Sequence, residues 1–146
     1  MNESLGFYEK HIQSHFTSQH CGIDLKNFGK VTDEIYFPID SIGEYHYSFA
    51  VKERAKSIID FVAKMDNKPL WYRINVIDQA INEYIGIGWL NLESDWMQFI
   101  LDYLNNDRAE QNGDTVCILF DENFEWAICF TLSQDYDKLI IEKYQK

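Results

Sequence analysis

Apolar residues in the first part of the chain recur mainly at helical spacing. Segment 5–16 carries an apolar side chain every three or four residues, at Leu5, Tyr8, Ile12 and Phe16. Residues 49–65 repeat this spacing and place charged residues on the opposite side. Residues 69–86 follow it again, with Pro69 suited to a first helical turn and Gly86 to a helix end. The pattern therefore predicts a series of helices before residue 87.

Short segments between these helices alternate apolar and polar residues instead. Ile35, Phe37 and Ile39 share one side of an extended segment, which predicts a short strand. Pro38 has no N–H to donate, so this strand is expected at a sheet edge. Residues 45–51 alternate in the same way and are also expected to begin extended.

Residues 94–107 predict one more helix. Ser94 suits the N-cap, and Asp95 is favourable in the first turn. Most of the circumference is apolar, and only Asp95, Gln98 and Asp102 form a polar strip. Such a helix must be covered on more than one side.

The last part of the chain predicts antiparallel strands. Residues 115–121 and 124–132 are rich in β-branched and aromatic side chains and flank a turn at Glu122 and Asn123. A two-residue turn pairs Leu119 with Trp126 and leaves apolar residues on both faces of the hairpin. Either helices cover both faces, or one face is a binding surface. Residues 138–144 are the expected next strand.

These elements predict a single α+β domain spanning residues 1–146. N-terminal and central helices pack on a C-terminal antiparallel β-meander of about three or more strands. The 146 residues, 46% of them hydrophobic, suffice for one core. No apolar run is long enough to cross a bilayer, and the N-terminus lacks the pattern of a secretory signal. The odd number of cysteines, Cys21, Cys117 and Cys129, favours reduced thiols and a cytoplasmic location.

The charge is strongly acidic and unevenly distributed. The net charge is −11, and residues 74–146 carry 4 Lys/Arg and 14 Asp/Glu, against 9 and 10 in residues 1–73. This half of the chain repels phosphate backbones and anionic lipids, so we expect neither a nucleic acid nor a membrane as partner. It attracts a basic protein, although acidity alone also serves solubility.

Catalytic and metal-binding patterns are weak. His11, His15, His20 and Cys21 could together hold zinc, but no acid accompanies them at the spacing of a zinc-protease helix. Carboxylates gather in sequence at turns, where solvation is the usual state. The chain has no phosphate-binding glycine loop and no nucleophile-elbow serine motif. We therefore predict a protein that is not an enzyme and uses no metal or cofactor.

Aromatic residues, 16% of the chain, are interleaved with the acidic half. Carboxylates can steer and pair with basic groups of a partner, and aromatic side chains can anchor the contact. The predicted partner-binding residues lie in the hairpin turn, before the last strand and on the helix of residues 94–107: Asp121, Glu122, Glu125, Trp126, Asp135, Asp137, Asp95 and Asp102.

Residues 115–144, "TVCILFDENFEWAICFTLSQDYDKLIIEKY", resemble the terminal meander of small bacterial immunity proteins. These proteins neutralise polymorphic toxins, including those of contact-dependent growth inhibition. The shared pattern is a strand, the acidic turn Asp121-Glu122-Asn123, a strand with a central Trp126, and a short last strand. The resemblance implies that the partner is a toxin domain, such as a basic nuclease.

Three functions remain open on the sequence. The first is a cytoplasmic immunity or inhibitor protein that covers a basic toxin domain with an acidic, aromatic-containing surface. The second is a non-catalytic regulatory or scaffold module, in one form a homodimer that buries the second face of the sheet against another copy. The third is a small metal- or carboxylate-dependent enzyme.

Overall fold

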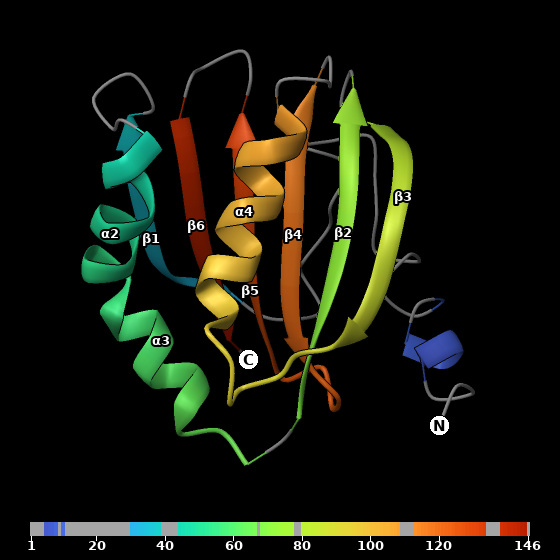
Figure 1. Cartoon of the computed structure of the whole chain (residues 1–146). Coiled ribbons are helices and arrows are strands. Elements are labelled where there is room, and N and C mark those ends of the chain that lie inside the picture. Colours follow the sequence, from blue (N-terminus) through green and yellow to red (C-terminus); the bar gives the residue numbers. More distant parts are fainter. Residues whose placement is uncertain are drawn as a thin grey trace.

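Six antiparallel strands form a single sheet (Figure 1). The computed structural model describes residues 5–8, 10, 30–38, 44–66, 68–77, 80–108, 113–133 and 138–145, and within these ranges it leaves out the side chains of 30, 38, 44–48, 80–85, 105–108 and 133. The strands are β1 (Lys30–Pro38), β2 (Pro69–Ile77), β3 (Ala80–Trp89), β4 (Asp114–Asp121), β5 (Trp126–Ser133) and β6 (Lys138–Gln145). Their order across the sheet is β1-β6-β5-β4-β2-β3.

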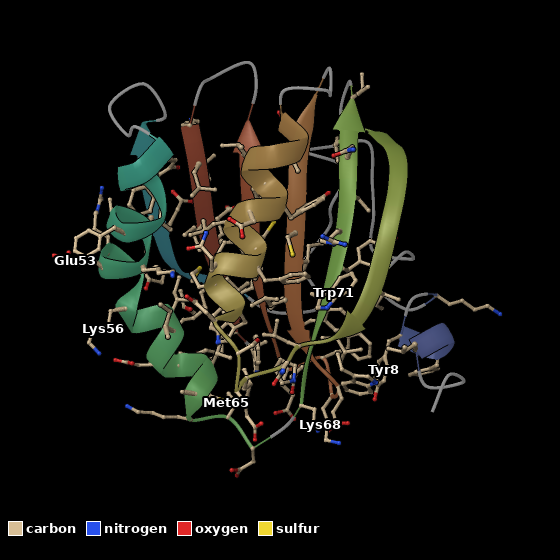
Figure 2. All side chains as sticks on the ribbon, viewed as in Figure 1. Tyr8, Glu53, Lys56, Met65, Lys68 and Trp71 are labelled. Atoms are coloured by element: carbon tan, nitrogen blue, oxygen red, sulfur yellow. The ribbon has the colours of Figure 1, made fainter. Side chains whose placement is uncertain are left out.

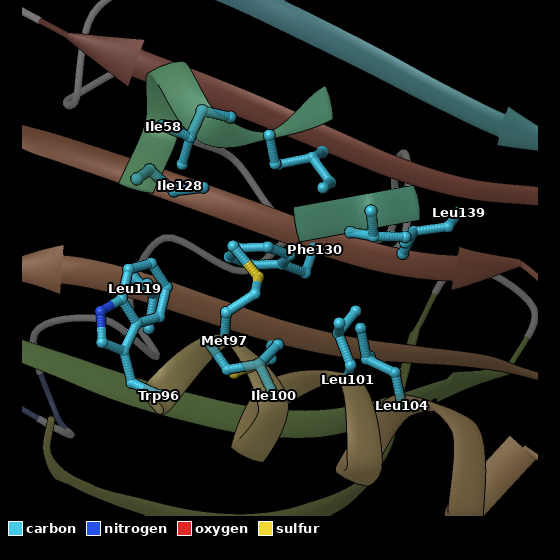
Figure 3. Packing of buried hydrophobic residues seen from close by; sticks show 14 of the residues in the cluster. Ile58, Trp96, Met97, Ile100, Leu101, Leu104, Leu119, Ile128, Phe130 and Leu139 are labelled. Carbon is cyan, nitrogen blue, oxygen red and sulfur yellow. The ribbon is translucent and has the colours of Figure 1, made fainter. Parts of the chain in front are cut away.

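Three helices of the described segments cover the same face of the sheet (Figure 1): α2 (Glu44–Arg54), α3 (Lys56–Ala63) and α4 (Trp96–Arg108). Their apolar sides meet the sheet in one core, which includes Ile58, Ile100 and Phe130, all at 0% exposure (Figure 3). None of the helices that the structure describes is long and apolar enough to span a membrane.

The opposite face of the sheet is also buried. Tyr72, Ile118 and Phe120 are almost completely inaccessible there, and Leu5 and Tyr8 pack against the same cluster. Residues 5–8 are helical, as the spacing of apolar residues predicts. Both faces of the hairpin are therefore covered within one chain.

The predicted arrangement of helices on a C-terminal meander of about three or more strands is wrong, because the described residues form mainly a six-stranded sheet with few short helices. Residues 69–86 were expected to be helical and instead form β2 and most of β3. In β2, Leu70, Tyr72 and Ile74 face one side while Arg73 faces the other, which is the alternation of a strand. Residues 45–51, expected to begin extended, lie in α2.

Several individual elements are confirmed. The edge strand near Pro38 is β1, the helix near Trp96 is α4, and the hairpin and last strand are β4, β5 and β6. The hairpin connection is longer than predicted, because Leu119 pairs with Ile128 rather than Trp126. This register differs from the predicted one by two residues, so each side chain keeps its predicted face.

Candidate protein-binding surface on α4

The helix α4 has one buried side and one exposed side. Met97, Ile100 and Leu104 are buried against the sheet (Figure 3), whereas Asp102 is exposed and Phe99 keeps 38% of its surface in solvent. The 3.6-residue period of a helix places Asp95, Phe99 and Asp102 along the same outer side. Most of this exposed strip is therefore acidic, with an aromatic ring in its middle.

Asp95 fixes the start of this helix. Its Oδ1 accepts a hydrogen bond from the backbone N–H of Gln98 at 3.2 Å, which makes Asp95 the N-cap in place of the predicted Ser94. Its Oδ2 lies 2.6 Å from Nζ of Lys52 on α2. The hydrogen bond from Lys52 is the main cause that holds the pKa of Asp95 below its ordinary value. Asp95 is therefore already paired, although its side chain is 61% exposed.

Asp102 and the loop before α4 extend the exposed strip. Gln98 Nε2 donates a hydrogen bond to Asp102 Oδ1 at 2.6 Å, one turn along the helix. Asp102 takes part in none of the ion pairs found among the described residues. Leu92 is 40% exposed, and Glu93 beside it is exposed. We call Leu92, Glu93, Asp95, Phe99 and Asp102 the α4 surface. It combines carboxylates with two accessible apolar side chains.

An open groove borders this surface. It encloses about 290 Å³ between α3, the end of α2 and the start of α4, and its lining includes Ile59, Leu92 and Trp96 around the Lys52–Asp95 pair. Its walls are largely apolar, and it is open to solvent. A partner that contacts the α4 surface can therefore also place a side chain in this depression.

Two residues of the hairpin turn are not available to a partner. Asp121 is 0% exposed, and its Oδ1 accepts hydrogen bonds from the N–H groups of Glu125 at 2.6 Å and Trp126 at 3.3 Å. Trp126 is 2% exposed and packs edge-on against Phe61 of α3, with ring centroids 5.4 Å apart. Asp121 and Trp126 were both predicted to contact a partner, but their side chains are buried inside the protein, so they are not part of the candidate surface.

The remaining predicted residues have different positions. Glu125 is exposed and Glu122 is half-buried, and their turn lies at the same end of the sheet as the loop that leads into α4 (Figure 1). Of the predicted set, the structure thus places Asp95 and Asp102 together on α4, and Glu122 and Glu125 at the adjoining end. Asp135 and Asp137 lie outside the described residues.

An arginine that the sequence did not single out, Arg73, lies beneath α4. The guanidinium carbon of Arg73 lies 4.5 Å from the ring centre of Tyr103, 4.7 Å from that of Trp71 and 5.2 Å from that of Phe99. Trp71, on β2 (Figure 2), lies against Gly86 and Gly88 of β3. The alternating glycines were the available signal, because a strand that lacks side chains on one face leaves room for a large ring from its neighbour.

The described residues offer little for catalysis. They include no group of three or more His, Cys, Asp or Glu side chains that could hold a metal ion. Burial raises the pKa of Cys129 to about 12, and burial also raises the pKa of Cys117, so both thiols stay protonated. The histidine cluster at residues 11–20 and Cys21 lie outside the described residues.

Comparison with known proteins gives no match to the chain among protein-family models, curated proteins or solved structures.

Proposed function

We propose that the protein is a non-catalytic inhibitor that binds a basic protein through the α4 surface. The observation that carries this proposal is the exposure of Phe99 between Asp95 and Asp102 on one helix face. An aromatic anchor surrounded by charged groups is a common composition of a protein-binding site. Leu92 and the adjoining groove enlarge the apolar part of this site.

The charge of the whole molecule supports a basic partner. A net charge of −11 produces a negative field that accelerates association with a positively charged protein and repels nucleic acids. Glu93 and Asp102 contribute to this field at the α4 surface, and Glu122 and Glu125 extend it to the adjoining end of the sheet. The Lys52–Asp95 pair neutralises part of it, so we assign Asp95 to the structure of the helix start more than to steering.

We further propose that the partner is a bacterial toxin domain and that the protein acts in the cytoplasm as its immunity protein. The hairpin of β4 and β5, with the acidic turn after Asp121, supports this through its resemblance to immunity proteins. A basic nuclease domain is the partner class with the matching charge, because such a domain must attract phosphate backbones. The α4 surface would then compete with the nucleic acid for the same basic site.

A homodimer through the second face of the sheet has less support. Ile118 and Phe120 on that face are fully buried within one chain, so the described part of β4 offers no apolar surface there to a second copy. An inhibitor with an exposed helix surface needs no such dimer.

The test starts from the gene neighbourhood and proceeds to growth. We expect a large toxin gene immediately upstream, and we expect cells that produce its C-terminal domain to grow only when this protein is also produced. A purified complex of one copy of each protein, stable in size-exclusion chromatography, is the matching biochemical result.

One test variant and one control variant decide whether the α4 surface binds the partner. Phe99→Ser removes the exposed ring and should weaken the complex by about 1–2 kcal/mol through faster dissociation. Phe49→Ser removes another exposed ring, 67% accessible on α2, and should leave the affinity unchanged. Growth arrest that this protein does not relieve would contradict the immunity function, and equal affinity loss in both variants would contradict the surface.

A further inference from the structure

Three polar side chains beneath α4 form a row on the helix-covered face of the sheet. Arg73 and Asn75 are two residues apart on β2, and Thr115 of β4 is the Cα partner of Asn75. Strand alternation puts all three on the same face as Cys117, which belongs to the core under the helices. We call Arg73, Asn75 and Thr115 the polar row.

The polar row contains an unusual concentration of unused hydrogen-bonding groups. Asn75 and Thr115 are both 0% exposed. In the part of the chain that the structure describes, Nε of Arg73, both amide atoms of Asn75 and Oγ1 of Thr115 are buried and have no hydrogen-bond partner. Buried polar groups in native proteins are nearly always paired, and each exception calls for an explanation, such as an ordered water, an ion or a functional role.

The surroundings hold Arg73 in place without neutralising it. The rings of Trp71, Phe99 and Tyr103 enclose its guanidinium, and no described carboxylate forms an ion pair with it. Gly88 makes room for Trp71, since a Cβ there would come within 2.6 Å of the indole. Tyr103 is fixed in turn, because its hydroxyl donates to the carbonyl of Ile74 at 3.1 Å.

The polar row also has a side that faces solvent. Arg73 and Trp71 are half-buried, and Phe99 beside them is 38% exposed, whereas Asn75 and Thr115 lie completely inside. Of the three residues of the polar row, Arg73 therefore lies nearest to solvent.

The groups of the row define the chemistry of a ligand. The N–H groups of Arg73, the Nδ2 of Asn75 and the hydroxyl of Thr115 are donors, which suits a carboxylate. The Oδ1 of Asn75 is an acceptor and needs an N–H or O–H from the same ligand. The second half of α4 lies over this place, and the partial negative charge at the end of a helix disfavours a dianion and favours a cationic group.

We propose that the polar row binds a small zwitterionic amino acid, with its carboxylate on Arg73 and Thr115 and its ammonium group on the Oδ1 of Asn75. The zwitterion carries no net charge, so the net charge of −11 does not oppose its entry. This site is independent of the protein-binding function of the α4 surface, although Phe99 adjoins both.

The test is a ¹H–¹⁵N NMR titration that follows the Arg73 Nε and Asn75 side-chain amide resonances. Glycine is the first probe, and acetate, glycolate and inorganic phosphate are compared with it. We expect glycine to shift both resonances to saturation with a Kd of about 1 mM or less. Acetate should bind at least about tenfold more weakly, because it leaves the Asn75 acceptor unpaired.

A matched pair of threonine variants separates binding from folding. Thr115→Val keeps the shape and removes the hydroxyl, so it should weaken glycine binding about tenfold or more while leaving the unfolding midpoint equal or higher. Thr131→Val is the control. Thr131, on β5, is buried on the face of the sheet opposite to the polar row, and its hydroxyl contacts the thiol of Cys129. This variant should leave glycine binding unchanged.

Each other outcome overturns the proposal. Resonances that do not move at about 50 mM glycine, which is far above the expected Kd, exclude the site. Tighter binding of phosphate than of glycine contradicts the zwitterion, and equal binding in Thr115→Val and the unaltered protein contradicts the placement of the carboxylate.

Discussion

Replacement of Asp121 by alanine should destabilise the protein strongly, although this residue lies at a surface turn in the sequence. Its carboxylate is inaccessible and accepts two backbone hydrogen bonds, from Glu125 at 2.6 Å and from Trp126 at 3.3 Å. The backbone carbonyl of Asp121 also accepts the N–H of Phe124 at 3.0 Å. The turn is therefore closed by one residue, which holds Phe124 at a φ of 55° in the left-handed region.

The magnitude follows from these bonds. A hydrogen bond to a charged acceptor contributes about 1.5–3 kcal/mol, and the buried N–H of Trp126 would be left without a partner. The cost of burying the carboxylate offsets part of this, so we expect Asp121→Ala to lower the free energy of unfolding by about 2–4 kcal/mol. Asp121→Asn keeps a neutral acceptor and should cost roughly half as much.

Urea unfolding at pH 7, followed by tryptophan fluorescence, measures the effect. Glu122→Gln is the matched control, because Glu122 is half-buried in the same turn, and it should change the unfolding free energy by less than about 0.5 kcal/mol. Equal urea unfolding midpoints for Asp121→Ala and the unaltered protein would refute the structural role of this carboxylate. Asp121 would then again be a candidate for partner binding.

Two further predictions concern the start of α4 and the Trp71 environment. The hydrogen bond from Lys52 lowers the pKa of Asp95 in the folded state, so the stabilisation from this ion pair is complete above the ordinary carboxylate pKa and disappears as pH falls through the lowered value. Asp95→Asn should therefore lower the free energy of unfolding by about 0.5 kcal/mol at pH 7 and leave it unchanged near pH 2. A loss of stability that does not depend on pH would contradict this. Gly88→Ala should lower the free energy of unfolding in urea by about 1–3 kcal/mol, because the added Cβ would lie 2.6 Å from the Trp71 ring. Gly86→Ala should lower it clearly less, because its Cβ would lie 3.5 Å from the same ring. The reverse order would show that Trp71 does not lie over β3.

The sequence predicted secondary structure correctly where the local spacing of apolar residues is clear. It predicted the wrong secondary structure where pairing with a strand far along the chain selects the conformation. Helix α4 and the strands of residues 114–145 show clear periodicity, and both are confirmed. In residues 69–86, Ile74, Ile77 and Ile81 fit a helical stripe, whereas the alternation from Leu70 to Val76 fits a strand. Pairing of β2 with β4, far along the chain, selects the strand, and this contact cannot be derived from local spacing.

The candidate site was predictable to a similar degree. The polar strip of Asp95 and Asp102 follows from helical spacing alone, and the structure exposes both. The acidity of Asp121 gave no indication that its carboxylate turns inward to the N–H groups of the hairpin. No prediction from the sequence concerned Arg73, because only the position of α4 over β2 brings the rings of Phe99 and Tyr103 to its guanidinium.

The most direct test of the α4 surface compares two charge reversals with the same net effect. Glu93→Lys with Asp102→Lys changes this surface, and Glu34→Lys with Glu53→Lys changes exposed positions outside it, on β1 and on α2 (Glu53 in Figure 2). The measurement is the association rate constant with the toxin domain as a function of ionic strength. We predict that the first pair slows association about tenfold or more at low salt and flattens its salt dependence, while the second pair has a several-fold smaller effect. Equal slowing by both pairs would show that only total charge matters, and would contradict a binding surface on α4.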